Sequence, residues 1–195
     1  MANFIDEFMK SMGPQVANEM SKSLGINKNV ASQIIPQIAP LILGGLKKQK
    51  DEHGGAPRVD HILNKYGSAD VLSDIGGLFK SKVQESPDPK LGGLLGDSGI
   101  QAAKMLGNQF NLDSGTAMKL IPMLAPLILG ALTKKRDQDG AGSSGIASLL
   151  DQDGDGSVLD DVAGFLMKGL GGGGSSKAGA NILGTLLGGL FGKRK

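Results

Sequence analysis

One loop late in the sequence has the residue types and the spacing of a metal site. Carboxylates alternate at Asp151, Asp153 and Asp155, and Gly156 and the start of a predicted helix follow them. Alternating carboxylates can surround a hard cation while glycine allows the sharp turn, as at the start of a calcium-binding loop. The pattern predicts Ca²⁺ held by oxygens of six residues, which are Asp151, Asp153, Asp155, Ser157, Asp160 and Asp161.

The same loop has a structural interpretation that stays open. The twelfth position, which carries a bidentate acid in a calcium loop, is Val162. Asp160 or Asp161 would therefore have to close the site, and the affinity would be weak. The aspartates could instead cap the next helix, because carboxylates accept hydrogen bonds from its free N-terminal amides. Asn64 and Tyr66 stand at matching positions in the first half of the chain, so the shared fold does not need an ion.

The helices that must position this loop belong to a duplicated segment. Residues 35–54 and 121–140 are identical at twelve of twenty positions, with an offset of 86 residues. When the offset moves to 87, a second block of identities continues as far as Gly164. Self-similarity at a fixed period indicates a repeated structural unit. The duplication covers about residues 13–81 and 99–168.

Hydrophobic periodicity predicts an all-α fold of two tandem helical units with helix-turn-helix-like packing. Apolar residues recur every three or four positions, and no stretch alternates with a period of two for long enough to form a sheet. Pro36 and Pro40 interrupt the most apolar helix, so we expect a kink or a break just before Pro36. One helix is predicted to end at Gly25, and the next to be capped by Asn27.

Segments that cannot stay helical divide the chain. It is predicted to have three parts: 1–88 as the first unit, 89–168 as the second unit with the acidic loop, and 169–195 as a Gly-rich tether with an apolar, basic tail. Pro87 and Pro89 mark the linker between the units. Within the first unit, a loop is predicted over residues 51–57, and one last helix is predicted from Val71 to Phe79.

Composition argues against several classes of function. The chain has no cysteine, which excludes disulfides, thiolate metal sites and thiol nucleophiles. No signal-like segment opens the chain and no apolar run reaches the roughly 20 residues of a membrane span, so a cytoplasmic location is expected. Net charge is 0 over residues 1–88 and −2 over 89–168, whereas nucleic acid requires a clustered basic face. His53 and His61 are interpreted as solvated polar residues, and no nucleophile stands beside a base, so no enzyme activity is expected.

Two motifs, in this order, resemble a known family. The Pro-x-x-Ala-Pro-Leu-Ile-Leu-Gly segment and the later loop Asp-x-Asp-Gly-Asp-Gly-Ser-Val-Leu-Asp-Asp resemble the YidB-like bacterial proteins of unknown function (domain-of-unknown-function family 937). The resemblance extends over about residues 13–168. It implies an all-helical fold with helix-turn-helix-like packing, and it brings no assigned activity and no catalytic residues. This sequence departs from two equal copies in that the acidic loop occurs only in the second unit.

The C-terminal tail is predicted to be adhesive. A stripe of small residues with apolar neighbours permits close helix approach, and it consists of Ala180, Gly184, Gly188 and Gly192 beside Leu187 and Phe191. Self-association or docking on protein is the first interpretation of this pattern. Residues 169–195 also carry a net charge of +4, so contact with an anionic membrane surface is the second interpretation.

Together these features predict a non-enzymatic, self-associating structural or interaction protein, with calcium at the acidic loop as a modulator. The expected partner is a second copy or another protein, and neither a catalytic nor a cofactor-binding residue is assigned. One alternative is a helix-turn-helix-like DNA-binding regulator that reads bases through Asn27, Lys28, Asn29 and Gln33. Structural packing of that helix pair is the favoured interpretation. The other alternative is a peripheral membrane protein that binds through its tail.

Overall fold

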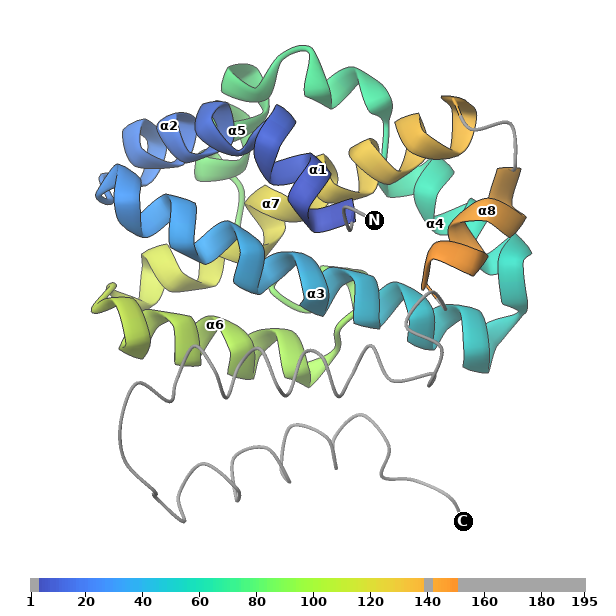
Figure 1. Ribbon diagram of the computed structural model, residues 1–195. Helices are drawn as coiled ribbons and strands as arrows, with labels where there is room; N and C mark the ends of the chain where they lie inside the picture. Colours follow the sequence, from blue (N-terminus) through green and yellow to red (C-terminus); the bar gives the residue numbers. More distant parts are fainter. Residues whose placement is uncertain (1–3, 139–141, 151–195) are drawn as a thin grey trace, which may run out of the picture.

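The computed structural model describes residues 4–138 and 142–150 of the chain (Figure 1). Within these residues the chain forms helices and no strand, which confirms the all-α prediction. The elements are α1 (Phe4–Ser11), α2 (Gly13–Leu24), α3 (Lys28–His53), α4 (Gly55–Tyr66), η1 (Ala69–Leu72), α5 (Ile75–Gln84), η2 (Leu91–Gly93), α6 (Asp97–Phe110), α7 (Ser114–Gln138) and α8 (Gly142–Leu150), where η denotes a 3₁₀ helix.

Local signals set the turn between α2 and α3. Gly25 ends α2 in the left-handed conformation with φ 68°, and its amide donates to the Ser21 carbonyl. Glycine adopts this conformation without the steric cost that a Cβ adds. The side chain of Asn27 then accepts a hydrogen bond from the Asn29 amide and caps α3. Both predicted boundaries are confirmed.

The turn between α6 and α7 is built on the same plan with different residues. Asn111 takes the place of Gly25 and has φ 52°, a conformation that asparagine tolerates better than most residues. Asp113 takes the place of Asn27, and its Oδ1 accepts from the Thr116 amide at 2.9 Å. The duplicated sequence therefore produces a duplicated helix pair.

The two long helices run through their prolines without interruption. Pro36 and Pro40 lie inside α3, and Pro122 and Pro126 lie inside α7. Of the two predicted outcomes at Pro36, a break is therefore wrong, and a kink stays a prediction. The reason is burial. Four fully buried isoleucines of α3 contribute about 2 kcal/mol each, which offsets roughly 3 kcal/mol per proline, and they are Ile34, Ile35, Ile38 and Ile42.

Two further boundaries differ from the sequence prediction. The predicted loop at residues 51–57 is wrong, because α3 continues to His53 and α4 begins at Gly55. Gly54 and Gly55, with φ 125° and 66°, make the corner. The single helix predicted from Val71 to Phe79 is also wrong. It divides into η1 and α5, because the carboxylate of Asp74 accepts from the Gly77 amide at 2.8 Å and starts a new helix.

The two predicted units are interleaved and share one hydrophobic core. The central helices α3 and α7 pack against each other (Figure 1). From the first unit, η1 and α5 pack on α7 of the second unit, and α4 packs on α7 and α8. The buried side chains of both units form a single cluster in the described part of the chain. Neither unit therefore buries its apolar surface without the other.

Glycines allow the closest crossing between the units. A Cβ placed on Gly67 would lie 2.8 Å from the carbonyl oxygen of Leu129, and one on Gly130 would lie 2.7 Å from that of Ser68. Real Cβ atoms essentially never come that close to a backbone oxygen. The turn that follows α4 can therefore lie against the backbone of α7 only because both positions lack a side chain.

Candidate functional site

The residues that the sequence marks for chemistry or adhesion lie outside the described part of the chain, which ends at Leu150. They are the acidic-loop residues Asp151, Asp153, Asp155, Ser157, Asp160 and Asp161, and the tail residues Ala180, Gly184, Leu187, Gly188, Phe191 and Gly192. Calcium binding and tail association therefore stay predictions. Within residues 4–138 and 142–150, no group of three or more metal-ligating side chains is placed to hold an ion.

The described residues form a surface cleft of about 770 Å³ between the two units. Its walls come mainly from the first unit, from the end of α3, α4, η1 and α5, and the linker with η2 completes them. Its floor comes from the second unit and consists of Pro122, Ala125, Pro126 and Leu129 on α7. Clefts of roughly 300–1,000 Å³ with apolar lining and a few polar groups are typical of binding sites.

The floor of this cleft is the duplicated motif. Residues at positions i, i+3, i+4 and i+7 share one face of a helix, and the floor residues have this spacing. Their counterparts on α3 are Pro36, Ala39, Pro40 and Leu43, and all four pairs are identical. The cleft is not visible in the sequence, although the repeated face is, because its floor and most of its walls come from different units.

Proline gives the floor a polar feature as well. Pro126 has no amide hydrogen, so α7 cannot supply the usual donor to the carbonyl four residues earlier, at Pro122. Pro122 itself lines the cleft. An apolar floor of this kind can therefore offer a backbone acceptor to a bound donor.

Much of the polar lining of the cleft is held in structural interactions. Arg58 Nε donates to Gln49 Oε1 at 3.0 Å, and Lys82 Nζ donates to Glu85 Oε2 at 2.6 Å. The hydrogen bonds from Lys82 and Ser81 lower the pKa of Glu85 below its ordinary value. The first contact joins α4 to α3, and the second lies at the end of α5. These groups therefore stabilise the walls of the cleft.

The linker wall is fixed by one carboxylate. Asp88 Oδ1 accepts from the Lys90 amide at 3.0 Å, and Oδ2 accepts from the Gly92 amide at 2.8 Å. On α4, Lys65 Nζ lies 5.2 Å from the centre of the Tyr66 ring, within the range of a cation–π contact. Tyr66 is 47% exposed, the highest value among the large apolar side chains of the described residues.

Both histidines also line the cleft. His53 ends α3 and His61 lies on α4, and both side chains are exposed. Their exposure agrees with their interpretation as solvated polar residues. Their location beside a shared cleft was not visible in the sequence, because the corner at Gly54 folds α4 back along α3.

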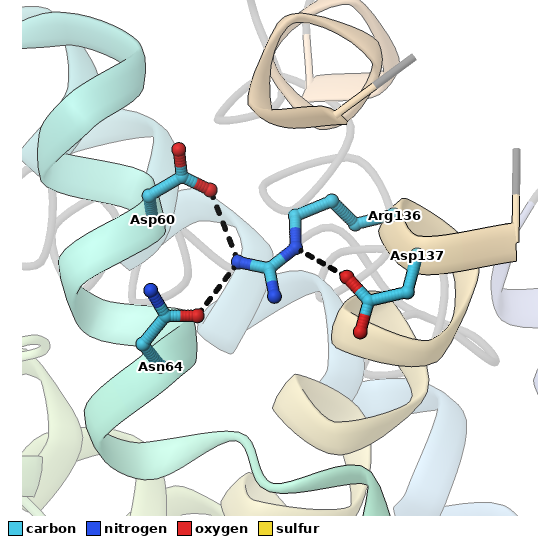
Figure 2. Close-up of polar contacts among 4 residues, drawn as sticks. All are labelled: Asp60, Asn64, Arg136 and Asp137. Atoms are coloured by element: carbon cyan, nitrogen blue, oxygen red, sulfur yellow. Dashed lines mark hydrogen bonds and ion pairs between the residues drawn. The ribbon is translucent and has the colours of Figure 1, made fainter. Parts of the chain in front are cut away.

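A polar cluster ties the end of α7 to α4 (Figure 2). Arg136 Nη1 donates to Asp60 Oδ1 at 3.0 Å and to Asn64 Oδ1 at 2.9 Å, and Nε donates to Asp137 Oδ1 at 2.9 Å. The bonds to Asp137 and Asp60 raise the pKa of Arg136 above its ordinary value. Only 14% of its side chain is exposed. This guanidinium links the two units outside their apolar core.

The helix pair α2–α3 is where the DNA-binding alternative would lie. Lys28, Asn29 and Gln33 are exposed at the start of α3, whereas the side chain of Asn27 is engaged in the helix cap. In the copy, α6–α7, the cap is the acidic Asp113. An anionic carboxylate at that place repels a phosphate backbone, so the pair suits packing better than DNA reading.

Together, the fold and the cleft define a class of protein: a duplicated all-α domain with interleaved repeats and a cleft between them. The family described as "Bacterial protein of unknown function (DUF937)" matches residues 6–135 and 131–194, and the chain belongs to it. The resemblance seen in the sequence is thereby confirmed. The first match passes the predicted boundary at residue 88 and ends within α7. No curated protein and no solved structure matches the chain.

By length and composition alone, α3 and α7 could each cross a membrane. In the folded protein, however, 61% of the most apolar window of each helix is buried, and both helices lie at the centre of the core. Buried core helices pass the same test. This finding is weak evidence for a membrane location.

Proposed function

We propose that the protein is a non-enzymatic interaction protein that associates with copies of itself. The observation that carries the proposal is the cleft, which presents an apolar helix face at the surface between the repeats. Its volume of about 770 Å³ suits a short apolar segment. Its polar lining is largely engaged in holding the walls together, which favours binding over reaction chemistry.

The C-terminal tail supplies the segment that enters the cleft of the next copy. Leu187 and Phe191 are four residues apart, so a helical tail presents them on one face. An amphipathic helix that places such residues in an apolar groove is a common mode of peptide recognition. A tail in the cleft of a neighbour is a head-to-tail contact, which builds a ring or an open filament.

Sedimentation velocity tests this proposal. The full chain is expected to assemble, and a chain that ends at Gly169 is expected to stay monomeric. The double variant Leu187→Glu and Phe191→Glu is expected to behave like the shortened chain, because charge on the apolar face prevents burial. Assembly of both variants to the extent of the full chain would refute the role of the tail.

A pair of variants on α5 tests the role of the cleft. Leu78 lines the cleft and is half-buried, whereas Val83 is half-buried on the same helix outside the lining. Leu78→Glu is expected to weaken assembly at least tenfold, and Val83→Glu to leave it unchanged. Circular dichroism checks that both variants fold. Equal assembly of the two folded variants would show that the tail binds another surface.

Electrophoretic mobility shifts test the DNA-binding alternative. We expect no binding to duplex DNA at low salt, because the body of the chain carries no net positive charge. Binding that falls steeply with salt would support the regulator instead.

Calcium modulation is part of the proposal and has its own test. Isothermal calorimetry is expected to show weak Ca²⁺ binding by the full chain and none by Asp153→Ala. Absence of heat from the unmodified protein would remove calcium from the proposal and leave the capping interpretation of the loop.

A further inference from the structure

Residues 67–81 form a segment that crosses from the first unit to the second. It contains η1 and most of α5, and these helices pack on α7 and α2. Gly67 lies against the carbonyl of Leu129, and Gly130 lies against that of Ser68. At the far side, the place of a Cβ on Gly76 lies 4.0 Å from Glu19 Cδ on α2. This crossing therefore has defined contacts at both ends.

The second unit carries the same segment in its sequence, at residues 154–168. Five of its residues are identical to Gly67, Val71, Leu72, Asp74 and Gly77, and they are Gly154, Val158, Leu159, Asp161 and Gly164. The receiving helix is duplicated as well. Leu43 and Gly44 of α3 match Leu129 and Gly130 of α7. Among the described residues, no atom lies within 4 Å of the place of a Cβ on Gly44.

The described helices bring the start of this segment to α3. Helix α8 packs on α4, α7 and α3, as α4 packs on α3, α7 and α8. It ends at Leu150, which matches Leu63. Three residues separate Leu150 from Gly154, and three separate Leu63 from Gly67. The connection from the end of the helix to the glycine therefore has the same length in both units.

We propose that residues 154–168 pack on α3 and α6 of their own chain as residues 67–81 pack on α7 and α2. The short reach selects the same chain over a second copy as the source of the segment. The packing completes a pseudo-twofold arrangement about the crossing of α3 and α7.

This packing assigns structural roles to acidic-loop residues. Asp161 matches Asp74, which accepts from a helix amide at 2.8 Å and so caps α5. Asp155 stands where the hydroxyl of Ser68 caps η1. Asp151 stands where Asn64 accepts from Arg136, and the residue at the place of Arg136 is Lys50. Three predicted calcium ligands thus take the places of first-unit residues that bind protein groups.

Thiol cross-linking tests the packing, because the chain has no cysteine of its own. The reference pair is Glu19→Cys with Gly76→Cys. The test pair at the matching positions is Met105→Cys with Ala163→Cys. The mismatched pair is Glu19→Cys with Ala163→Cys. Each full-length variant is treated with a short bismaleimide and examined on a denaturing gel and by mass spectrometry of its peptides.

The test pair is expected to cross-link within one chain to the same extent as the reference pair. The mismatched pair is expected not to cross-link. A test pair that stays open while the reference closes would overturn the proposal. So would closure between two chains, which runs as a dimer and identifies a second copy as the source. Equal closure of the mismatched pair would also overturn it, because the segment would then have no fixed place.

A stability measurement gives a second, independent answer. Gly44→Val and Gly130→Val are both expected to lower Tm, because a side chain at either place displaces the crossing segment. An unchanged or raised Tm for Gly44→Val alone would contradict the proposal. Both readouts are taken within one chain, so they stay valid if the protein does not self-associate. Failure of the proposed function and failure of this packing are therefore distinguishable.

Discussion

The two long helices carry the same Pro-x-x-Ala-Pro-x-x-Leu face but differ where their neighbours differ. A Cβ on Gly45 of α3 would lie 2.9 Å from the Leu94 carbonyl oxygen and 2.7 Å from Leu95 Cδ2. The matching residue of α7 is Ala131, whereas the glycine of α3 leaves room for the backbone of Leu94. Positions that are identical in α3 and α7 make contacts that both helices share. Positions that differ make contacts found at only one of the two helices.

The same comparison applies to the two helix caps and the two helix ends. Asn27 caps α3 and the charged Asp113 caps α7. At the other end, Lys50 of α3 matches Arg136 of α7, which holds Asp60 and Asn64 of α4. The motif fixes the helices, and the residues around it adapt each copy to its surroundings.

The largest effect is expected where the two units cross. Gly67→Ala should destabilise the protein by about 3 kcal/mol, because the new methyl overlaps the Leu129 carbonyl and neither backbone can move freely. Urea denaturation followed by circular dichroism measures the loss. Gly76→Ala is the matched control, because its Cβ would lie 3.6 Å from its nearest neighbour and should cost nothing. Equal stability of the two variants would show that the crossing is looser than described.

A smaller effect is expected at the polar link between the units. Arg136→Ala should cost about 1 kcal/mol, because Asp60 and Asn64 lose a shared donor whose own side chain is only 14% exposed. Arg136→Lys, which introduces the residue found at the matching end of α3, should recover part of the loss. Lys134→Ala is the control, since Lys134 is exposed on the same turn. If all of these variants have the same Tm as the unmodified protein, the polar link has no role in stability.

The smallest effect distinguishes the two caps by their charge. Hydrogen bonds from Thr116 lower the pKa of Asp113 below its ordinary value of 3.8. A carboxyl group whose pKa is lowered by folding stabilises the folded protein at pH values above its ordinary pKa. This stability is lost as the pH falls through the folded pKa. Tm should therefore fall below about pH 4, and Asp113→Asn should reduce the fall.

The reciprocal change sharpens the cap comparison. Asn27→Asp places a carboxylate where α3 now has a neutral cap, so Tm should become more sensitive to acid. Scans from pH 7 to pH 2 follow both variants. Identical acid profiles for the unmodified protein, Asp113→Asn and Asn27→Asp would show that the caps do not titrate with folding.

Local chemistry made part of the fold predictable. The left-handed turn at Gly25, the cap at Asn27 and the all-helical pattern depend on neighbouring residues, and sequence shows neighbours directly. The cap at Asp74 is a similar local signal, but the single helix predicted from Val71 to Phe79 overlooks it. At Pro36 the sequence predicts a kink or a break, because it shows the cost of a proline without the burial that offsets it.

The cleft could not be predicted for a different reason. Its floor residues are about 60 positions away from the wall that α4 provides, and only the crossing of the units brings them together. The repeated face was visible as an apolar helix, and burial is the ordinary interpretation of such a face. What sequence could not show is that the two prolines of one copy stay partly accessible beneath the walls of the other.

The interleaving of the units constrains synthesis of the chain. Helix α5 ends at Gln84, and α7, on which it rests, is complete only at Gln138, about 54 residues later. At ~5–20 residues per second, a ribosome needs ~3–11 s to make that stretch. During this interval the side of α5 that packs on α7 has no partner, although α2, on which α5 also packs, is already made. The nascent protein must therefore remain partly open, within reach of chaperones, until its second half leaves the exit tunnel.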